Sequence, residues 1–280
     1  MLSAQVSLVV LGAALLHAAW NATAHRIPDQ AVGFALIGIA ITVVPALLLP
    51  VAGLPGAAAW PYLCSSAAVH VGYTGLLLAS YRAGDFAHVY PLARGTAPLV
   101  VALLSVTVVG RPLCAVDGAG VVTLTAGLAI LALAGGALRR TSRRASLAAV
   151  ATGLAIAGYT TIDGVGVHAA STPLAYTAWL FLLQGPWVPV AVLVARRGRL
   201  RMPAGRWALG LASGVVSLVA YGLVIWAQAH GSLAQVAALR ETSILFGALI
   251  GVLLFAERFG RQRLLGAAIT LAGVLLLTVG

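Results

Sequence analysis

YRAGDFAHV (residues 81–89) and QAHGSLAQV (residues 228–236) are related strings that share the pattern Gly-x-x-Ala-x-Val and lie 147 residues apart. A similar triplet follows each string, RGT at 94–96 and RET at 240–242, at a displacement of 146 residues. Self-similarity at a displacement of about half the chain predicts an internal duplication. We therefore expect a fold made of two related halves.

The composition around these strings is that of a membrane protein. Of the 280 residues, 61% are hydrophobic and 8% are charged, whereas soluble domains carry about 25% charged residues. Apolar stretches of about 20 residues, the length that a helix needs to cross a bilayer, follow one another along the chain. We expect an all-α integral membrane protein that crosses the cell (inner or plasma) membrane several times.

Breaks at proline, glycine and charged residues divide the chain into ten predicted membrane-spanning helices. Their approximate ranges are 3–24, 31–52, 60–80, 87–109, 117–137, 146–167, 173–195, 206–228, 233–256 and 263–279. Residues 1–140 and residues 141–280 each hold five of these spans. Because five is an odd number, the second half inserts with the opposite topology, which predicts two inverted five-helix repeats.

The positions of the arginines predict the orientation in the membrane. All 17 basic residues are arginine, and 14 of them lie in the connections after predicted spans one, three, five, seven and nine. Only Arg111 lies in an opposite connection, and Arg94 and Arg240 lie within spans. Cytoplasmic loops carry the excess of basic residues in membrane proteins. We therefore expect both termini on the extracytoplasmic side.

The same distribution argues against a nucleic-acid partner. The net charge is +11, but nucleic-acid-binding proteins gather their basic residues on a soluble face. Cys64 and Cys114 lie in separate segments, which argues against a disulfide framework or a cysteine metal site. We expect no metal, no cofactor and no nucleic acid, and the sequence leaves the oligomeric state open.

Several motifs along the chain form a family pattern. They are LHAAWNA at 16–22, YRAG at 81–84 leading to YPLARGTAP at 90–98, YTTIDG at 159–164, and AALRETS at 237–243, followed by ER at 257–258. Together they resemble the drug/metabolite transporter superfamily in its ten-helix EamA-type branch, although Arg111 stands where the first repeat usually has a glutamate. The resemblance implies two five-helix repeats around a central cavity, with alternating access. Members move amino acids, sugars, nucleotide derivatives and drugs, and export is common among the bacterial ones.

Four charged residues within predicted spans are the first candidates for substrate binding. Arg94 and Arg240 lie at matching depths, where a charge costs at least about 2.5 kcal/mol, so they either line the transport path and hold an anionic group or form a structural ion pair. Glu241 and Asp163 are the buried acids, and either could carry a coupling proton. Since successive helical residues point about 100° apart, Glu241 should not pair with Arg240 and should have another partner, such as Arg94.

Polar and aromatic residues on shared helix faces are the remaining candidates. They are His17, Trp20, Asn21, His70, Tyr73, Tyr90, Tyr159, Tyr221 and Trp226. Such stripes suit a mostly apolar cavity with a few polar groups, although hydrogen bonding between helices and interfacial aromatic residues produce the same pattern. We expect the cavity to be lined by spans one, three, four, six, eight and nine.

These observations predict a secondary transporter, a permease that exports small metabolites by alternating access. Two fixed positive charges and two removable negative charges favour amino-acid-like or other anionic or zwitterionic substrates. The partners are then a small-molecule substrate, protons as coupling ion and the lipid bilayer. A multidrug exporter of lipophilic compounds is the alternative, because aromatic residues also hold drug-like rings. An intramembrane enzyme is a third reading that no recognised catalytic motif supports.

Overall fold

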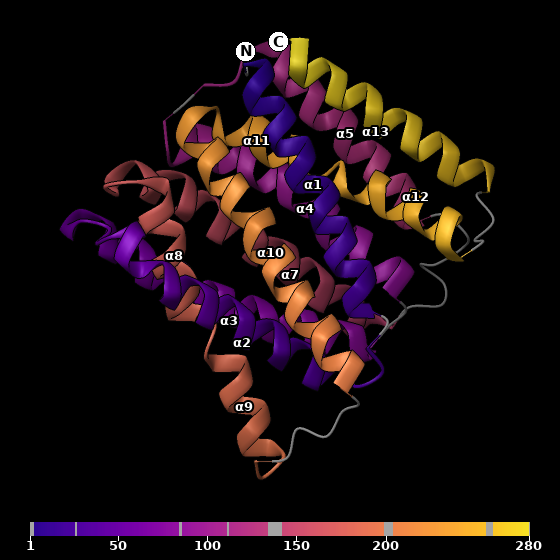
Figure 1. The fold of residues 1–280 in the computed structure, drawn as a ribbon. Coiled ribbons are helices and arrows are strands. Elements are labelled where there is room, and N and C mark those ends of the chain that lie inside the picture. Colours follow the sequence, from indigo (N-terminus) through magenta and orange to yellow (C-terminus); the bar gives the residue numbers. More distant parts are fainter. Residues whose placement is uncertain are drawn as a thin grey trace.

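The computed structural model describes residues 3–25, 27–83, 86–110, 112–133, 142–198, 204–255 and 260–279. Within these residues the chain is a bundle of tilted helices joined by short connections (Figure 1). Both ends of the chain lie at the same end of the bundle (Figure 1). The described part of the chain is therefore all-helical, as expected.

The first half contains α1 (Ala4–His25), α2 (Gln30–Ala52), the 3-10 turn η1 (Ala57–Ala59), α3 (Trp60–Ala83), α4 (Phe86–Thr107) and α5 (Ala115–Leu133). The second half contains α7 (Arg143–Gly166), η3 (Val167–Ala169), α8 (Pro173–Gln184), α9 (Trp187–Ala195), α10 (Ala204–His230), α11 (Leu233–Arg240), α12 (Ser243–Phe255) and α13 (Arg261–Val279). Capping side chains begin several of these helices. Asp29, Ser142 and Thr172 accept hydrogen bonds from the N–H groups three residues ahead in α2, α7 and α8, which satisfies free donors at a helix start.

Five of the described helical segments are long and apolar enough to cross a membrane. They are Ala4–Ala24, Gln30–Ala52, Arg143–Ala169, Pro173–Ala195 and Gly205–His230, and the apolar helices Leu92–Thr107 and Ala115–Leu131 are shorter. Large apolar side chains face outward, with Leu47 75% and Val51 79% exposed. Such a surface suits lipid rather than water, so the chain is a multi-pass membrane protein.

Two of the predicted spans are broken helices. The span predicted at 173–195 is divided at Gly185 and Pro186, because proline has no backbone N–H to donate within a helix. The span predicted at 233–256 is divided at Glu241 and Thr242. Their N–H groups bond three residues back, to the carbonyl oxygens of Ala238 (3.0 Å) and Leu239 (3.2 Å). This tighter turn, typical of 3-10 geometry, changes the direction of the side chains around it.

Helices from the two halves pack against one another throughout the bundle. α5 packs on α13, α3 on α7, α1 on α10, α2 on α10 and α8, α4 on α7, and α1 also on α11 and α12. Between α5 and α13 the backbones approach closely, since a side chain at Gly273 would meet the backbone of Leu124 and one at Gly127 would meet Thr270. Small residues allow this close packing of helices in membranes.

Candidate substrate-binding site

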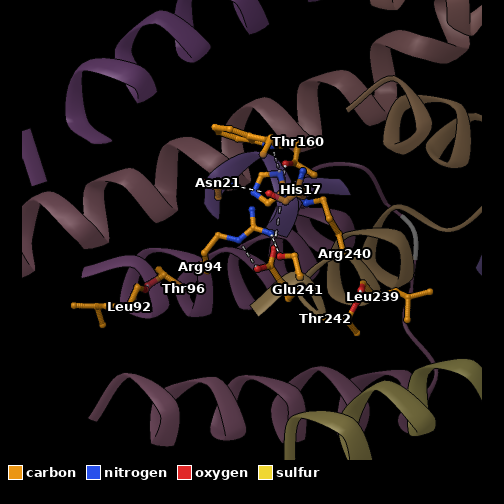
Figure 2. A network of polar contacts seen from close by, with 12 residues as sticks. His17, Asn21, Leu92, Arg94, Thr96, Thr160, Leu239, Arg240, Glu241 and Thr242 are labelled. Atoms are coloured by element: carbon orange, nitrogen blue, oxygen red, sulfur yellow. Dashed lines mark hydrogen bonds and ion pairs between the residues drawn. The ribbon is translucent and has the colours of Figure 1, made fainter. Parts of the chain in front are cut away.

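A buried ion pair joins the two halves of the chain. Nε of Arg94 in α4 lies 2.8 Å from Oε2 of Glu241, in the turn between α11 and α12 (Figure 2). Nη2 of Arg94 donates a 2.8 Å hydrogen bond to Oγ of Ser243, the first residue of α12. The side chains of Arg94 and Glu241 are 4% and 1% exposed. Arg94 is thus the partner of Glu241 that the sequence suggested.

Arg240 is paired less completely. Its Nη2 lies 3.8 Å from Oε1 of Glu241 and donates to Oγ1 of Thr160 at 3.4 Å (Figure 2), while its Nε makes no hydrogen bond to a described group. The prediction that Glu241 points away from Arg240 is wrong, because the tight turn after α11 brings the two side chains together. In this arginine cluster (Arg94, Arg240 and Glu241), two guanidinium groups share one carboxylate, which leaves one excess positive charge.

A cavity of about 110 Å³ lies within the bundle, enough for several water molecules. It is lined by His17, Trp20, Phe34, Ile37, Gly38, Ile41, His70, Val71, Tyr73, Thr74, Leu77, Tyr159, Phe181, Gln184, Gly185, Val188, Ser217 and Tyr221. Among these described lining residues there is no arginine, aspartate or glutamate. His17 connects the cavity with the arginine cluster, because its side chain lies close to both guanidinium groups (Figure 2).

Aromatic rings form much of the cavity wall. The rings of His70 and Tyr159 stack with their centroids 3.8 Å apart, and Tyr73 and Tyr221 meet Tyr159 edge-on at 5.4 and 5.8 Å. A wall of this kind favours flat or apolar groups and offers few polar contacts.

Trp20 fixes the orientation of His17. The two rings meet edge-on with centroids 5.3 Å apart, and Nε1 of Trp20 donates to Nδ1 of His17 at 3.3 Å. An indole nitrogen only donates, so Nδ1 of His17 is an acceptor and a neutral ring carries its proton on Nε2. His17 is therefore held between the cavity and the arginine cluster.

Asp163 lies behind the cavity wall and is fully buried. The hydroxyl of Tyr176 in α8 donates to its Oδ1 at 2.9 Å, and the hydroxyl of Tyr221 in α10 donates to its Oδ2 at 2.6 Å. Tyr221 also lines the cavity. Tyr221 therefore connects the Asp163 carboxylate with the cavity wall.

The predicted site residues whose side chains are described divide into three groups. Six line the cavity, namely His17, Trp20, His70, Tyr73, Tyr159 and Tyr221. Four are buried charges next to it, namely Arg94, Arg240, Glu241 and Asp163. Asn21 and Trp226 do not line this cavity: Asn21 donates to the carbonyl of His17 at 2.8 Å, and Trp226 stacks on His230 with centroids 4.3 Å apart. The side chain of Tyr90 lies outside the described residues.

The helices that line this cavity differ from those predicted. α2, α8 and α9 contribute to the wall, whereas no described residue of α4, α11 or α12 does. The reason is that α4 packs on α7 while α11 and α12 pack on α1, so α1 and α7 stand between those helices and the cavity. The signal that could have revealed α8 is QGP at 184–186, a polar residue and a helix break within an apolar span.

The described helices form a multi-pass bundle with an internal cavity walled by both halves, an architecture that membrane transporters use. The second half of the chain, residues 143–279, matches the model of the EamA-like transporter family. This family lies within the drug/metabolite transporter superfamily. A small-molecule substrate and the lipid bilayer are therefore its partners, and the family consists of transporters rather than enzymes.

One solved structure confirms the fold over the whole chain. It is described only as the crystal structure of a protein, and it is similar with a TM-score of 0.74 at 17% sequence identity, covering 98% of both chains. At this identity the similarity concerns the fold alone. No curated protein matches the sequence.

Proposed function

We propose that this protein exports small anionic or zwitterionic metabolites, such as amino-acid-like compounds, across the inner or plasma membrane. The observation that carries the proposal is the excess positive charge of the arginine cluster beside the cavity. Nε of Arg240 has no described hydrogen-bond partner, and buried charges are normally paired. A substrate carboxylate supplies the missing negative charge.

The substrate occupies the site in two parts. Its apolar part lies among the aromatic rings around Tyr159, and its carboxylate points past His17 towards Arg240. Away from water the attraction between charges weakens less with distance than it does in solution. The arginine cluster therefore attracts a carboxylate in the cavity before any direct contact forms. The same field repels a lipophilic cation.

Alternating access follows from two inverted repeats, residues 1–140 and 141–280. The packing of the helices supports this division. Each helix of the first half has a counterpart in the second half. Exchanging the counterparts turns the α3–α7 contact into the α10–α1 contact, and the α4–α7 contact into the α11–α1 and α12–α1 contacts. It also turns the α3–α8 contact into the α10–α2 contact, and all of these contacts occur. The contacts α5–α13 and α2–α8 map onto themselves. Such pairwise exchange is what an internal two-fold axis produces.

A proton is the coupling ion of the proposed cycle. Among the described residues, the carboxyl groups of Asp163 and Glu241 are both fully buried next to the cavity, and intramembrane acids commonly form proton relays in transporters. A proton neutralises a buried carboxylate by itself, whereas a metal ion would need several ligands around it.

Flux into proteoliposomes tests the proposal with three radiolabelled probes, namely glutamate, alanine and tetraphenylphosphonium. We expect uptake of the anionic and zwitterionic probes. Arg94→Ala and Arg240→Ala should each reduce this uptake by about tenfold or more, since hydrogen bonds to charged groups contribute about 1.5–3 kcal/mol. Arg240→Lys should retain part of it, because lysine keeps the charge but loses the forked donors.

Arg196→Ala is the matched control, because Arg196 is 48% exposed and pairs with Asp29 away from the cavity. Full uptake of both amino acids by the two alanine variants at the arginine cluster would contradict the proposal. So would transport of tetraphenylphosphonium alone by the unchanged protein.

A multidrug exporter of lipophilic compounds is the second candidate. The observation that favours it is the aromatic wall, in which no described lining residue is an arginine, aspartate or glutamate. The three probes separate the two candidates. Turnover of a lipid or peptide in detergent without any flux would favour an intramembrane enzyme instead.

A further inference from the structure

We propose that Asp163 binds the coupling proton, which reaches it from the cavity through Tyr221 and through the His70–Ser66 pair. This inference rests on the proposed function and deepens it, because it chooses between the two buried acids. The geometry that supports it is a fully buried carboxylate hydrogen-bonded to Tyr221 of the cavity wall. The Ser66 hydroxyl, which bonds to His70 of the same wall, also acts on this carboxylate.

The first link is the Tyr221 hydroxyl, which donates to Oδ2 of Asp163 at 2.6 Å. In the transfer step, a hydronium ion in the cavity gives a proton to the phenol oxygen of Tyr221 and becomes water, while the phenol proton passes to Oδ2. Tyr221 ends as the neutral phenol, and Asp163 ends as the neutral acid. The reverse step returns the proton, so Tyr221 acts as a relay and gains no net charge.

The second link runs through His70 and Ser66 of α3. Nδ1 of His70 lies 3.0 Å from the carbonyl oxygen of Ser66 and 3.2 Å from its Oγ. A carbonyl oxygen only accepts, so Nδ1 carries a proton. Oγ of Ser66 then accepts from the ring, and its own proton is available to the Asp163 carboxylate, on which the same hydroxyl acts. His70 lines the cavity, which completes the connection.

The surroundings favour Asp163 over Glu241 as the group that changes its charge. Glu241 lies 2.8 Å from Arg94 and 3.8 Å from Arg240, so its protonation would leave two buried guanidinium groups without a counter-charge. No described arginine lies within ion-pair distance of Asp163, so its protonation breaks no ion pair among the described residues.

Three further helices present titratable or charged groups to Asp163, in addition to the α3 residue His70. These groups are Tyr176 of α8, Tyr221 of α10 and, farther away, Arg240 of α11. Tyr221 donates to Oδ2, so protonation of that oxygen weakens the bond to α10, while Oδ1 still accepts from Tyr176. Binding of the proton therefore also loosens the link that joins α7 to α10.

Infrared spectroscopy of the protein in liposomes tests the site without a transported probe. The chain has 6 acidic residues, which keeps the carboxyl region of the spectrum simple. Acid titration should reveal the C=O stretch of a buried protonated carboxyl group, absent in Asp163→Asn and retained in Glu241→Gln. Asp117→Asn is the matched control, because the Asp117 carboxylate accepts a hydrogen bond from Gln235 away from the cavity.

Tyr176→Phe and Asp163→Glu extend the test. Tyr176→Phe should move the band to higher frequency, because Oδ1, which is the carbonyl oxygen once Oδ2 holds the proton, loses its hydrogen-bond donor while the ring is kept. Asp163→Glu should retain a titrating band, which shows that a carboxyl at this position suffices. A band that survives in Asp163→Asn overturns the proposal, and so does one that vanishes in Glu241→Gln while that variant keeps its helical circular dichroism.

Flux of radiolabelled alanine separates this proposal from the proposed function. Asp163→Asn should abolish accumulation driven by a pH gradient and retain exchange of external for internal alanine. Gradient-driven accumulation in that variant would overturn the proton site. Absence of alanine flux in the unchanged protein would count against the proposed function, while the infrared titration would still decide whether Asp163 binds the proton.

Discussion

Trp179 of α8 donates a 2.9 Å hydrogen bond from Nε1 to the carbonyl oxygen of Gly53, in the connection between α2 and α3. Nearby, the hydroxyl of Ser171 donates to the carbonyl oxygen of Leu54 at 2.6 Å. Trp179 also meets Trp60 edge-on, with centroids 5.2 Å apart. These contacts close the end of the bundle near the start of α8 and tie the two halves together there.

The first prediction concerns this closed end. Trp179→Phe should speed hydrogen exchange of the segment 53–63 by about fivefold, because one hydrogen bond contributes about 1 kcal/mol. Mass spectrometry of the detergent-solubilised protein measures the rate. Trp187→Phe is the control and should leave that segment unchanged, since the Trp187 indole bonds to Leu183 within its own region at 2.9 Å. Equal rates in the two variants would show that the Gly53 bond does not hold this end closed.

The second prediction compares a buried ion pair with an exposed one. Glu241→Gln should destabilise the protein by about 3–5 kcal/mol, because it leaves two buried arginines uncompensated. Asp29→Asn should change stability by about 0–1 kcal/mol, because its pair with Arg196 is exposed to solvent, and asparagine still caps α2. Unfolding in detergent measures both variants. A similar loss of stability in the two would mean that the arginine cluster finds its counter-charge elsewhere.

The third prediction concerns the contact between α2 and the break after α8. A Cβ atom on Gly38 would lie 2.5 Å from Cδ of Pro189 and 2.9 Å from the carbonyl oxygen of Gly185. Gly38→Ala should therefore destabilise the protein by about 1–3 kcal/mol through overpacking and reduce alanine uptake. Gly72→Ala in α3 is the control, because a Cβ there meets nothing within 4 Å, and alanine favours a helix by up to about 1 kcal/mol. Equal stability of both variants would show that the close contact of Gly38 with Gly185 and Pro189 does not contribute to stability.

The fourth prediction concerns the stacked rings of the cavity wall. Tyr159→Phe should preserve the stack on His70, at a centroid distance of 3.8 Å, and should retain uptake of amino acids. Tyr159→Ala should remove the stack and reduce the apparent affinity by about tenfold, since an aromatic pair contributes about 0.5–1.5 kcal/mol beyond its burial. Concentration dependence of alanine uptake measures the difference. Equal affinity in the two variants would place the substrate away from this ring.

The sequence was a good guide to the helices and to the charged residues. Apolar length and punctuation placed the helices close to their observed positions, and the cost of burying a charge marked Arg94 and Glu241 as residues that need partners. It did not predict the turn at Glu241, because that geometry depends on local backbone hydrogen bonds. It also missed Phe34 and Gly38, since an entirely apolar helix gives no polar stripe to indicate which face meets a cavity.

The sharing of Glu241 by two arginines makes the two halves of the chain unequal partners. At the displacement that aligns the arginines, the position of Glu241 corresponds to Gly95, where a Cβ atom would lie 3.3 Å from Cβ of Leu128. Two copies of the first half, paired head to tail, would bring together two guanidinium groups and no carboxylate. One copy of each half supplies two arginines and a single acid. The glycine that allows α5 to approach therefore leaves the first half without an acid at this position, so the second half alone supplies the counter-charge of the cluster.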